Sequence, residues 1–301
     1  MSLADLIDDE IHAEAGRIKA LALFGHDKSE IMAAQIDEHL SFAKRVPKNA
    51  LAFEFARNAS GLPCAKALFV LDDGSHAEVQ VHDLAADLSH LHACFNVQTH
   101  LSQEGLWLDD DFSSEVPKIL GPVREEMGRA MVTQMLTSHA QTPIDETTLI
   151  EVLSRGLQHF SNALSSSTLP FGIKTYTPQF VAEEIDDAIK HSLKHTPEGN
   201  FVLGHIAFHQ GNVVVDGATK RASSIGGFEA LFYIDECALV AKSALAFGDD
   251  NEAQAEPNKA QVQYYIKCYQ SARGRAFTSD ERTRLDAFLA LERVLRRSRA
   301  K

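Results

Sequence analysis

Histidines and an asparagine gather in one short stretch of the chain, residues 204–216. His205 and His209 stand four residues apart, a spacing that on a helix would let both rings reach one metal ion. A zinc hydrolase with this spacing also carries a glutamate beside the first histidine, but residues 206–208 supply no acid. The glycine before Asn212 indicates a loop instead of a helix. We therefore expect His205 to be a structural histidine whose ring hydrogen-bonds the loop backbone.

The same stretch resembles the catalytic loop of the aminoglycoside phosphotransferase and choline kinase superfamily. That loop reads His-x-Asp-x-x-x-x-Asn and is followed by a short apolar strand. His205 and Asn212 occupy its two outer positions, and residues 213–215 supply the apolar strand. Ala207 stands where the family has its catalytic aspartate. The resemblance therefore implies a kinase-like loop that lacks its central acid.

Further segments extend the resemblance over residues 80–297 in outline. The family follows its loop with Ile-Asp-[Phe/Trp]-Glu, whose aspartate holds magnesium. Counting from Asn212, the matching segment is residues 224–229, which places Gly226 at the magnesium aspartate. No glycine-rich nucleotide loop precedes these motifs. Three other segments are similar to helices of the family: residues 83–93, 264–269 and 277–282.

The resemblance implies an α+β, protein-kinase-like fold with two lobes. A small mixed N-terminal lobe of helices and strands would span residues 1–78, and a large, mainly helical phosphotransferase-like lobe residues 79–301. Apolar periodicity adds the elements expected along the chain. The expected helices cover residues 3–45 (two helices), 117–139, 145–164, 177–194 and 237–247, and the expected strands cover residues 51–55, 64–71, 201–203 and 212–215.

Phosphoryl transfer requires groups that position the phosphates and the metal and that orient the acceptor hydroxyl. Ala207 cannot accept a proton, and the loss of a general base costs on the order of 10²–10⁴ in rate. Asn212 could still offer its carbonyl oxygen to magnesium, a cation that prefers oxygen ligands. Asp216 and Asp235 are the nearby acids that could replace the missing ones. The alternatives are that Asp216 belongs to a turn and that Asp235 caps the next helix.

Lys66 is the candidate for contacting a nucleotide phosphate, because it lies on an expected strand between two alanines. An exposed charge at the edge of a sheet explains a lone strand lysine equally well. His90 and His92 point to different faces of one expected helix, which is poor geometry for a shared ion. No Ser-His-Asp or Cys-His arrangement for nucleophilic catalysis is recognisable.

Composition limits the partners of the protein. The 301 residues carry 29 basic and 42 acidic side chains, a formal net charge of −13, which argues against a nucleic-acid partner. The four cysteines, widely spaced, predict reduced and mostly buried thiols. An acidic N-terminus and the lack of a long apolar run predict a cytoplasmic protein with no membrane partner. The basic end, residues 293–301, is expected to be a solvated helix terminus.

These features lead to one functional expectation and two alternatives. We expect a phosphotransferase-fold protein without conventional kinase activity and without a cofactor, which binds a small metabolite or a protein partner in the cleft between its lobes. The first alternative is an active small-molecule kinase that uses ATP and magnesium with rearranged acids. The second is an unrelated helical binding protein whose loop similarity is accidental.

Overall fold

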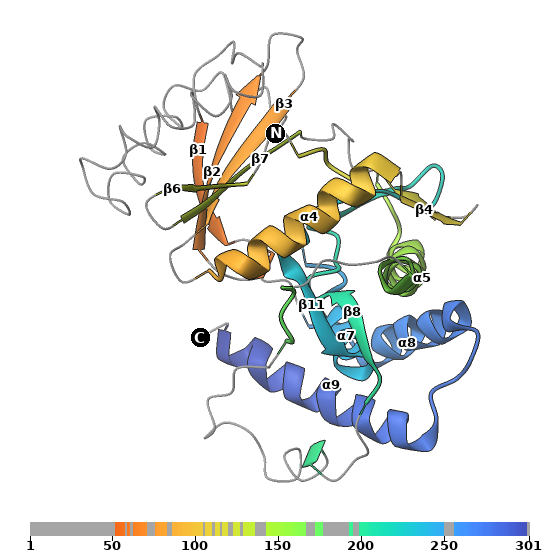
Figure 1. The fold of residues 1–301 in the computed structure, drawn as a ribbon. Coiled ribbons are helices and arrows are strands. Elements are labelled where there is room, and N and C mark those ends of the chain that lie inside the picture. Colours follow the sequence, from red (N-terminus) through yellow and green to blue (C-terminus); the bar gives the residue numbers. More distant parts are fainter. Residues whose placement is uncertain are drawn as a thin grey trace. The chain divides into compact units, whose positions relative to one another are not determined.

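A computed structural model gives the fold of the protein (Figure 1). It describes residues 52–57, 59–60, 63–70, 76–82, 86–104, 106–109, 112–114, 116–119, 123–126, 129–135, 143–166, 172–176, 193–194, 199–249 and 256–299. Contacts divide the chain into two compact units, Met1–Gly105 with Val116–Ser138, and Leu106–Glu115 with His139–Lys301. The two helices expected in residues 3–45 lie outside the described residues, as does nearly all of the helix expected over 177–194. The lobe boundary expected after residue 78 remains a prediction.

The first unit is an antiparallel five-stranded sheet that packs against one long helix. The strand order is β1-β2-β3-β7-β6. Apolar residues of the helix α4 and of β7 form the core between them, with Leu91, Phe95 and Val132 almost completely buried. The elements are β1 (Ala52–Arg57), β2 (Pro63–Val70), β3 (His76–His82), α4 (Leu88–Glu104), β6 (Arg124–Glu126) and β7 (Arg129–Met135).

One expectation for this part of the chain is wrong. The expected helix over residues 117–139 is replaced by the hairpin of β6 and β7. The β7 strand pairs with β3 over five residues, so hydrogen bonds to a distant strand override the local apolar spacing. Val132 and Gln134, two residues apart, are both buried, which is the alternation of a strand.

The second unit combines three two-stranded sheets with helices. The sheets pair β4 with β5, β9 with β10 and β8 with β11. The strands β4, β5, β8, β9 and β10 are Leu106–Asp109, Phe112–Ser114, Phe201–His205, Val213–Asp216 and Arg221–Ile225, and β11 is Leu231–Asp235. The helices are α5 (Glu146–Ser166), the 3₁₀ turn η1 (Phe228–Ala230), α7 (Glu236–Ala246), α8 (Lys259–Arg273) and α9 (Ser279–Arg299). The helices expected over residues 145–164 and 237–247 are confirmed as α5 and α7, and all four expected strands are confirmed.

A close approach of helix to sheet fixes the start of the histidine-containing loop. A Cβ atom added to Gly204, the residue before His205, would lie 2.4 Å from Leu239 Cδ2 on α7. Leu239 is completely buried, so it has no room to move aside. Glycine at this position therefore lets α7 pack directly on β8, where the loop begins.

All four cysteines are buried and form no disulfide, as expected from their spacing. No helix within the described ranges combines the length and the apolar character that crossing a bilayer requires.

Candidate functional site

His205 ends β8 and is completely buried. Its Nδ1 atom accepts a hydrogen bond of 3.2 Å from the backbone N–H of Ala207. The proton therefore sits on Nε2, which donates to the carbonyl oxygen of Gly226 at 2.9 Å. Burial lowers the pKa of His205 to about 4, so the ring is neutral at pH 7. The expected structural role for His205 is confirmed, because both ring nitrogens bond to backbone groups.

Three phenylalanine rings surround this histidine. Phe160 from α5, Phe208 from the loop and Phe228 from η1 each lie 6.0 to 6.5 Å from the His205 ring, measured between ring centroids. All three side chains are at most 1% exposed. The rings meet His205 edge to face, an arrangement that aromatic groups favour. The loop therefore begins at a buried aromatic cluster and not at an exposed polar surface.

Asn212 closes the loop through its side-chain amide nitrogen and its backbone carbonyl. Its Nδ2 donates to the carbonyl oxygen of Ala207 at 3.1 Å and lies 3.3 Å from Nε2 of His209. Its backbone carbonyl accepts from the N–H of Gly226 at 2.8 Å. The fold thus brings Ala207, Asn212 and Gly226 together, as the sequence spacing implies.

Neither Ala207 nor Gly226 carries a group that can do chemistry. Ala207 has only a methyl group and is 7% exposed. Gly226 has no side chain, although a Cβ atom there would lie 3.9 Å from the nearest atom, the oxygen of Asn212. The next residue, Gly227, also lacks a side chain and adopts a left-handed conformation with φ of 72°. The position facing Asn212 therefore has space for a Cβ atom and carries no carboxylate.

Asp216 lies at the far end of the β9–β10 hairpin. Its Oδ1 accepts from the N–H of Ala218 at 2.9 Å, and its Oδ2 accepts from the hydroxyl of Thr219 at 2.8 Å. These bonds form an Asx turn, the local motif by which aspartate stabilises a reversal of the chain. The alternative that Asp216 is a turn residue is confirmed.

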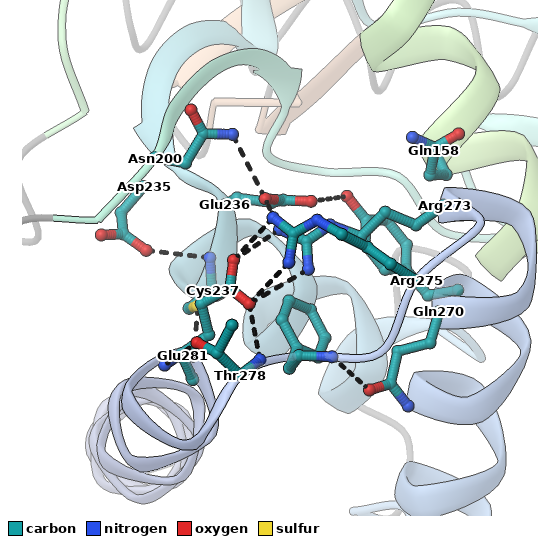
Figure 2. Close-up of polar contacts among 12 residues, drawn as sticks. Gln158, Asn200, Asp235, Glu236, Cys237, Gln270, Arg273, Arg275, Thr278 and Glu281 are labelled. Carbon is teal, nitrogen blue, oxygen red and sulfur yellow. Dashed lines mark hydrogen bonds and ion pairs between the residues drawn. The ribbon is translucent and has the colours of Figure 1, made fainter.

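Asp235 is the N-cap of α7 (Figure 2). Its Oδ1 accepts from the N–H of Cys237 at 2.8 Å, and its Oδ2 accepts from Nε of Arg284 on α9. The side chain is 5% exposed. The expected capping role is confirmed, and the carboxylate is held by the helix terminus and an arginine. Gly199 makes this contact possible, since a Cβ atom there would overlap the Asp235 carboxylate.

Lys66 lies on β2 of the first unit and faces Glu78 on β3, with Nζ 3.7 Å from Oε2. Glu78 also accepts from the side-chain amides of Gln80 and Gln134. Gln134 in turn accepts from Gln98 of α4 at 2.9 Å. Lys66 is thus one end of a polar network within the core of the sheet and helix.

No sequence pattern indicates this network, because single glutamines on strands and helices look like ordinary surface residues. None indicates the pairing of Asp249 with Arg296, which bond to each other beside the loop. Arg296 falls in the basic end that was expected to be a solvated helix terminus, and Asp249 follows the expected helix over residues 237–247.

The fold of the chain is similar to that of several solved structures. A microcompartment-associated aminopropanol kinase superposes with a TM-score of 0.60 at 14% identity, covering 86% of each chain. A macrolide 2′-phosphotransferase type I gives 0.55 at 15% identity, covering 87% of this chain and 89% of that one. An amicoumacin kinase in complex with AMP-PNP, Ca²⁺ and Ami gives 0.55 at 11% identity, covering 82% and 81%. The chain has the kinase-like phosphotransferase fold. No protein-family profile and no curated protein sequence matches it.

This kinase-like fold confirms the fold class expected from the loop and contradicts the alternative of an unrelated helical protein. Likeness at this level of identity establishes the fold and leaves the chemistry to the residues of the site. The loop has His205 and Asn212 at its two ends and Ala207 between them. Gly226 faces Asn212, and Gly227 follows it at the start of η1.

Proposed function

We propose that this kinase-like protein does not carry out conventional phosphoryl transfer and instead binds a small metabolite or a protein partner. The observation that carries the proposal is the pairing of Ala207 with Gly226 around Asn212. A kinase of this fold needs a carboxylate that orients the acceptor hydroxyl and oxygen ligands that hold the metal. The N–H of Gly226 donates to the carbonyl oxygen of Asn212, and Nδ2 of Asn212 donates to the carbonyl oxygen of Ala207, so Asn212 links the two positions at which these groups are missing.

The residues present do not fit a magnesium ion. Magnesium prefers carboxylate and water oxygens in octahedral geometry. Between His205 and Asn212, the side chains that carry an oxygen are those of Gln210 and Asn212, and both are neutral amides. Within the described part of the chain, no three side chains of His, Cys, Asp or Glu are grouped so that they could hold a metal. The loop therefore lacks the ligands that a magnesium-dependent catalytic step would require.

The surroundings of Lys66 in the first unit also support the non-catalytic proposal. A kinase strand lysine contacts nucleotide phosphates and pairs with a glutamate of the adjacent helix. In the described strands of this unit the sole lysine is Lys66, and its partner Glu78 lies on the neighbouring strand. From α4, the neutral side chain of Gln98 reaches the same network by donating to Gln134. In this proposal Lys66 pairs with Glu78 in the core network and does not bind a phosphate.

The alternative is an ATP- and magnesium-dependent kinase that uses Asp216 or Asp235. Asp216 would have to leave its turn, and Asp235 would have to give up the first turn of α7 and Arg284. Breaking a cap alone costs about 1 kcal/mol. We therefore prefer the non-catalytic proposal, and the net charge of −13 suits a cationic ligand.

Thermal unfolding with ATP, in the presence and absence of magnesium, tests the proposal. A ligand at about 100 times its dissociation constant adds about 2.7 kcal/mol, which raises Tm by several degrees. We expect no magnesium-dependent shift for the natural chain. ATP hydrolysis and phosphate transfer to a panel of amino alcohols and aminoglycosides should also stay at background.

The double variant Ala207→Asp/Gly226→Asp is the matched control. Gly226 accepts a side chain without a clash, and its φ lies outside the left-handed region. If the two carboxylates are what the site lacks, this variant gains a magnesium-dependent shift that the natural chain does not show. Transfer of phosphate by the natural chain that disappears in Asn212→Ala would overturn the proposal.

A further inference from the structure

The outer half of the loop, residues 209–212, rests on the C-terminal end of α7. The N–H of Gln210 donates to the carbonyl oxygen of Phe247 at 3.1 Å, and its side-chain amide donates to Gly248 at 2.6 Å. The N–H of Gly211 donates to the carbonyl oxygen of Asp249 at 2.9 Å. The end of a helix leaves carbonyl groups without partners inside the helix. Here the loop supplies N–H groups for the residues that follow α7.

Asp249 connects this contact to the last helix. Its two carboxylate oxygens accept from the two Nη atoms of Arg296 on α9, at 2.7 and 2.9 Å. The side chains are 24% and 18% exposed, so water screens the pair only in part. A bidentate arginine–carboxylate pair fixes the orientation of both groups as well as attracting them. Arg296 thereby holds Asp249 in place, and the backbone of Asp249 holds Gly211.

His209 lies at the centre of this contact. Burial lowers the pKa of its ring; Asp249 opposes that shift, while Lys242 and Arg296 add to it. Lys242 is itself paired with Glu292 of α9 at 3.4 Å. Nε2 of the ring lies 3.3 Å from Nδ2 of Asn212, and Nδ1 accepts from the N–H of Gly211 at 3.2 Å, so the ring contacts both residues that close the loop.

We infer that Asp249 and Arg296 are positioning residues for the loop, through which helix α9 sets the conformation of residues 209–212. The inference goes beyond the proposed function, because it concerns the loop itself and holds whether or not a ligand binds there. It assigns a role to the basic end of α9, which the sequence suggested was only solvated.

Amide hydrogen exchange in the full-length protein, resolved by residue, tests the inference. We expect Arg296→Met to make the amide of Gly211 exchange at least about tenfold faster, the factor that corresponds to about 1.4 kcal/mol of lost protection. Amides in β8 and β11 should keep their protection. The matched control is Arg293→Met, one turn earlier on α9, whose partner is Glu256 and not a residue bonded to the loop. This control should leave Gly211 unchanged.

Titration of the His209 ring by NMR gives a readout that general loss of stability would not move. Arg296→Met removes a cation and frees the Asp249 carboxylate, so the pKa of His209 should rise. Arg296→Lys keeps the charge without the two-pronged contact and should return the pKa towards the natural value. Unchanged exchange at Gly211 in Arg296→Met would overturn the inference. So would equal acceleration in β8 and β11, or the same response in Arg293→Met.

Discussion

At the scale of single residues, the side chains of His205 and Asn212 bond to the backbone of the loop. His205 satisfies a backbone N–H and a backbone carbonyl inside a cluster of phenylalanines. Leaving such buried groups without partners costs about 1–3 kcal/mol each. Ala207 and Gly226 supply these backbone groups and have no polar side chain of their own. Fold stability therefore explains why His205 belongs here in a chain without the central aspartate.

The buried ring of His205 predicts how stability depends on pH. Its pKa is about 4 in the folded protein and 6.5 for an ordinary histidine, so the unfolded chain binds more protons between these values. The contribution of neutral His205 to the free energy of unfolding should be fully present above about pH 6.5. It should fall as the pH drops towards 4, by up to about 1.4 kcal/mol per pH unit. Urea unfolding at several pH values measures the slope.

A His205→Gln variant separates this group from the rest of the protein. Glutamine can donate to Gly226 but does not titrate, so the slope between pH 6.5 and 4 should become shallower even if the variant is less stable at pH 7. Part of the slope should remain, because burial also lowers the pKa of His82 to about 4. An unchanged slope would show that His205 does not remain neutral in the folded state.

At the scale of elements, one polar corner joins α7, α8 and α9 (Figure 2). Thr278 and Glu281 form a capping box at the start of α9, with bonds of 2.7 and 3.2 Å. Hydrogen bonds from Arg275 and Arg273 hold the pKa of Glu281 well below its usual range. Arg273 also pairs with Glu236 in the first turn of α7, so two helices share one guanidinium group.

Arg273 and Arg275 form a matched pair for testing this corner. The side chains of Arg273 and Glu236 are each 6% exposed, so Arg273→Met leaves a buried carboxylate without its cation and should cost about 3 kcal/mol or more. Arg275 is 52% exposed and contacts the same Glu281, so Arg275→Met should change Tm little. Thermal and urea unfolding of the two variants measure the difference. Equal losses would mean that burial does not govern the corner.

At the scale of the whole molecule, charge is the dominant feature. An excess of 13 acidic groups, from 42 acidic and 29 basic side chains, repels itself and works against the compact state. Salt screens charges separated by more than about 10 Å at 0.1 M, but it weakens partly buried pairs much less. The repulsion is spread over the chain, whereas the pairs of Arg273 and Arg296 are short and partly covered.

Stability should therefore increase with ionic strength. We expect Tm to rise between about 10 and 150 mM sodium chloride, the range over which the screening length contracts from about 30 to 8 Å. Sucrose at matched osmolarity controls for general solute effects. A fall in Tm over this range would show that the ion pairs of α7, α8 and α9 outweigh the net repulsion.

Local pattern determined the parts of this protein that depend on neighbouring residues. The spacing of His205 and Asn212, the cap at Asp235 and the turn at Asp216 are each built from groups within a few positions of one another, so the sequence displays them. The strands β1 and β2 and the helix α5 also follow from short-range apolar pattern. These features located the loop, and the family resemblance that the loop carries predicted the fold class.

Tertiary structure decided everything that joins distant segments. The strands β6 and β7 exist because β7 pairs with β3, about fifty residues earlier in the chain, and this pairing overrides the helical spacing of residues 117–139. The network that joins Glu78 to Gln98 through Gln134, and the bonds from Arg296 to Asp249 beside the loop, likewise join residues that no local pattern links. Hydrogen bonds and ion pairs depend on separation in space, and sequence periodicity reports only separation along the chain.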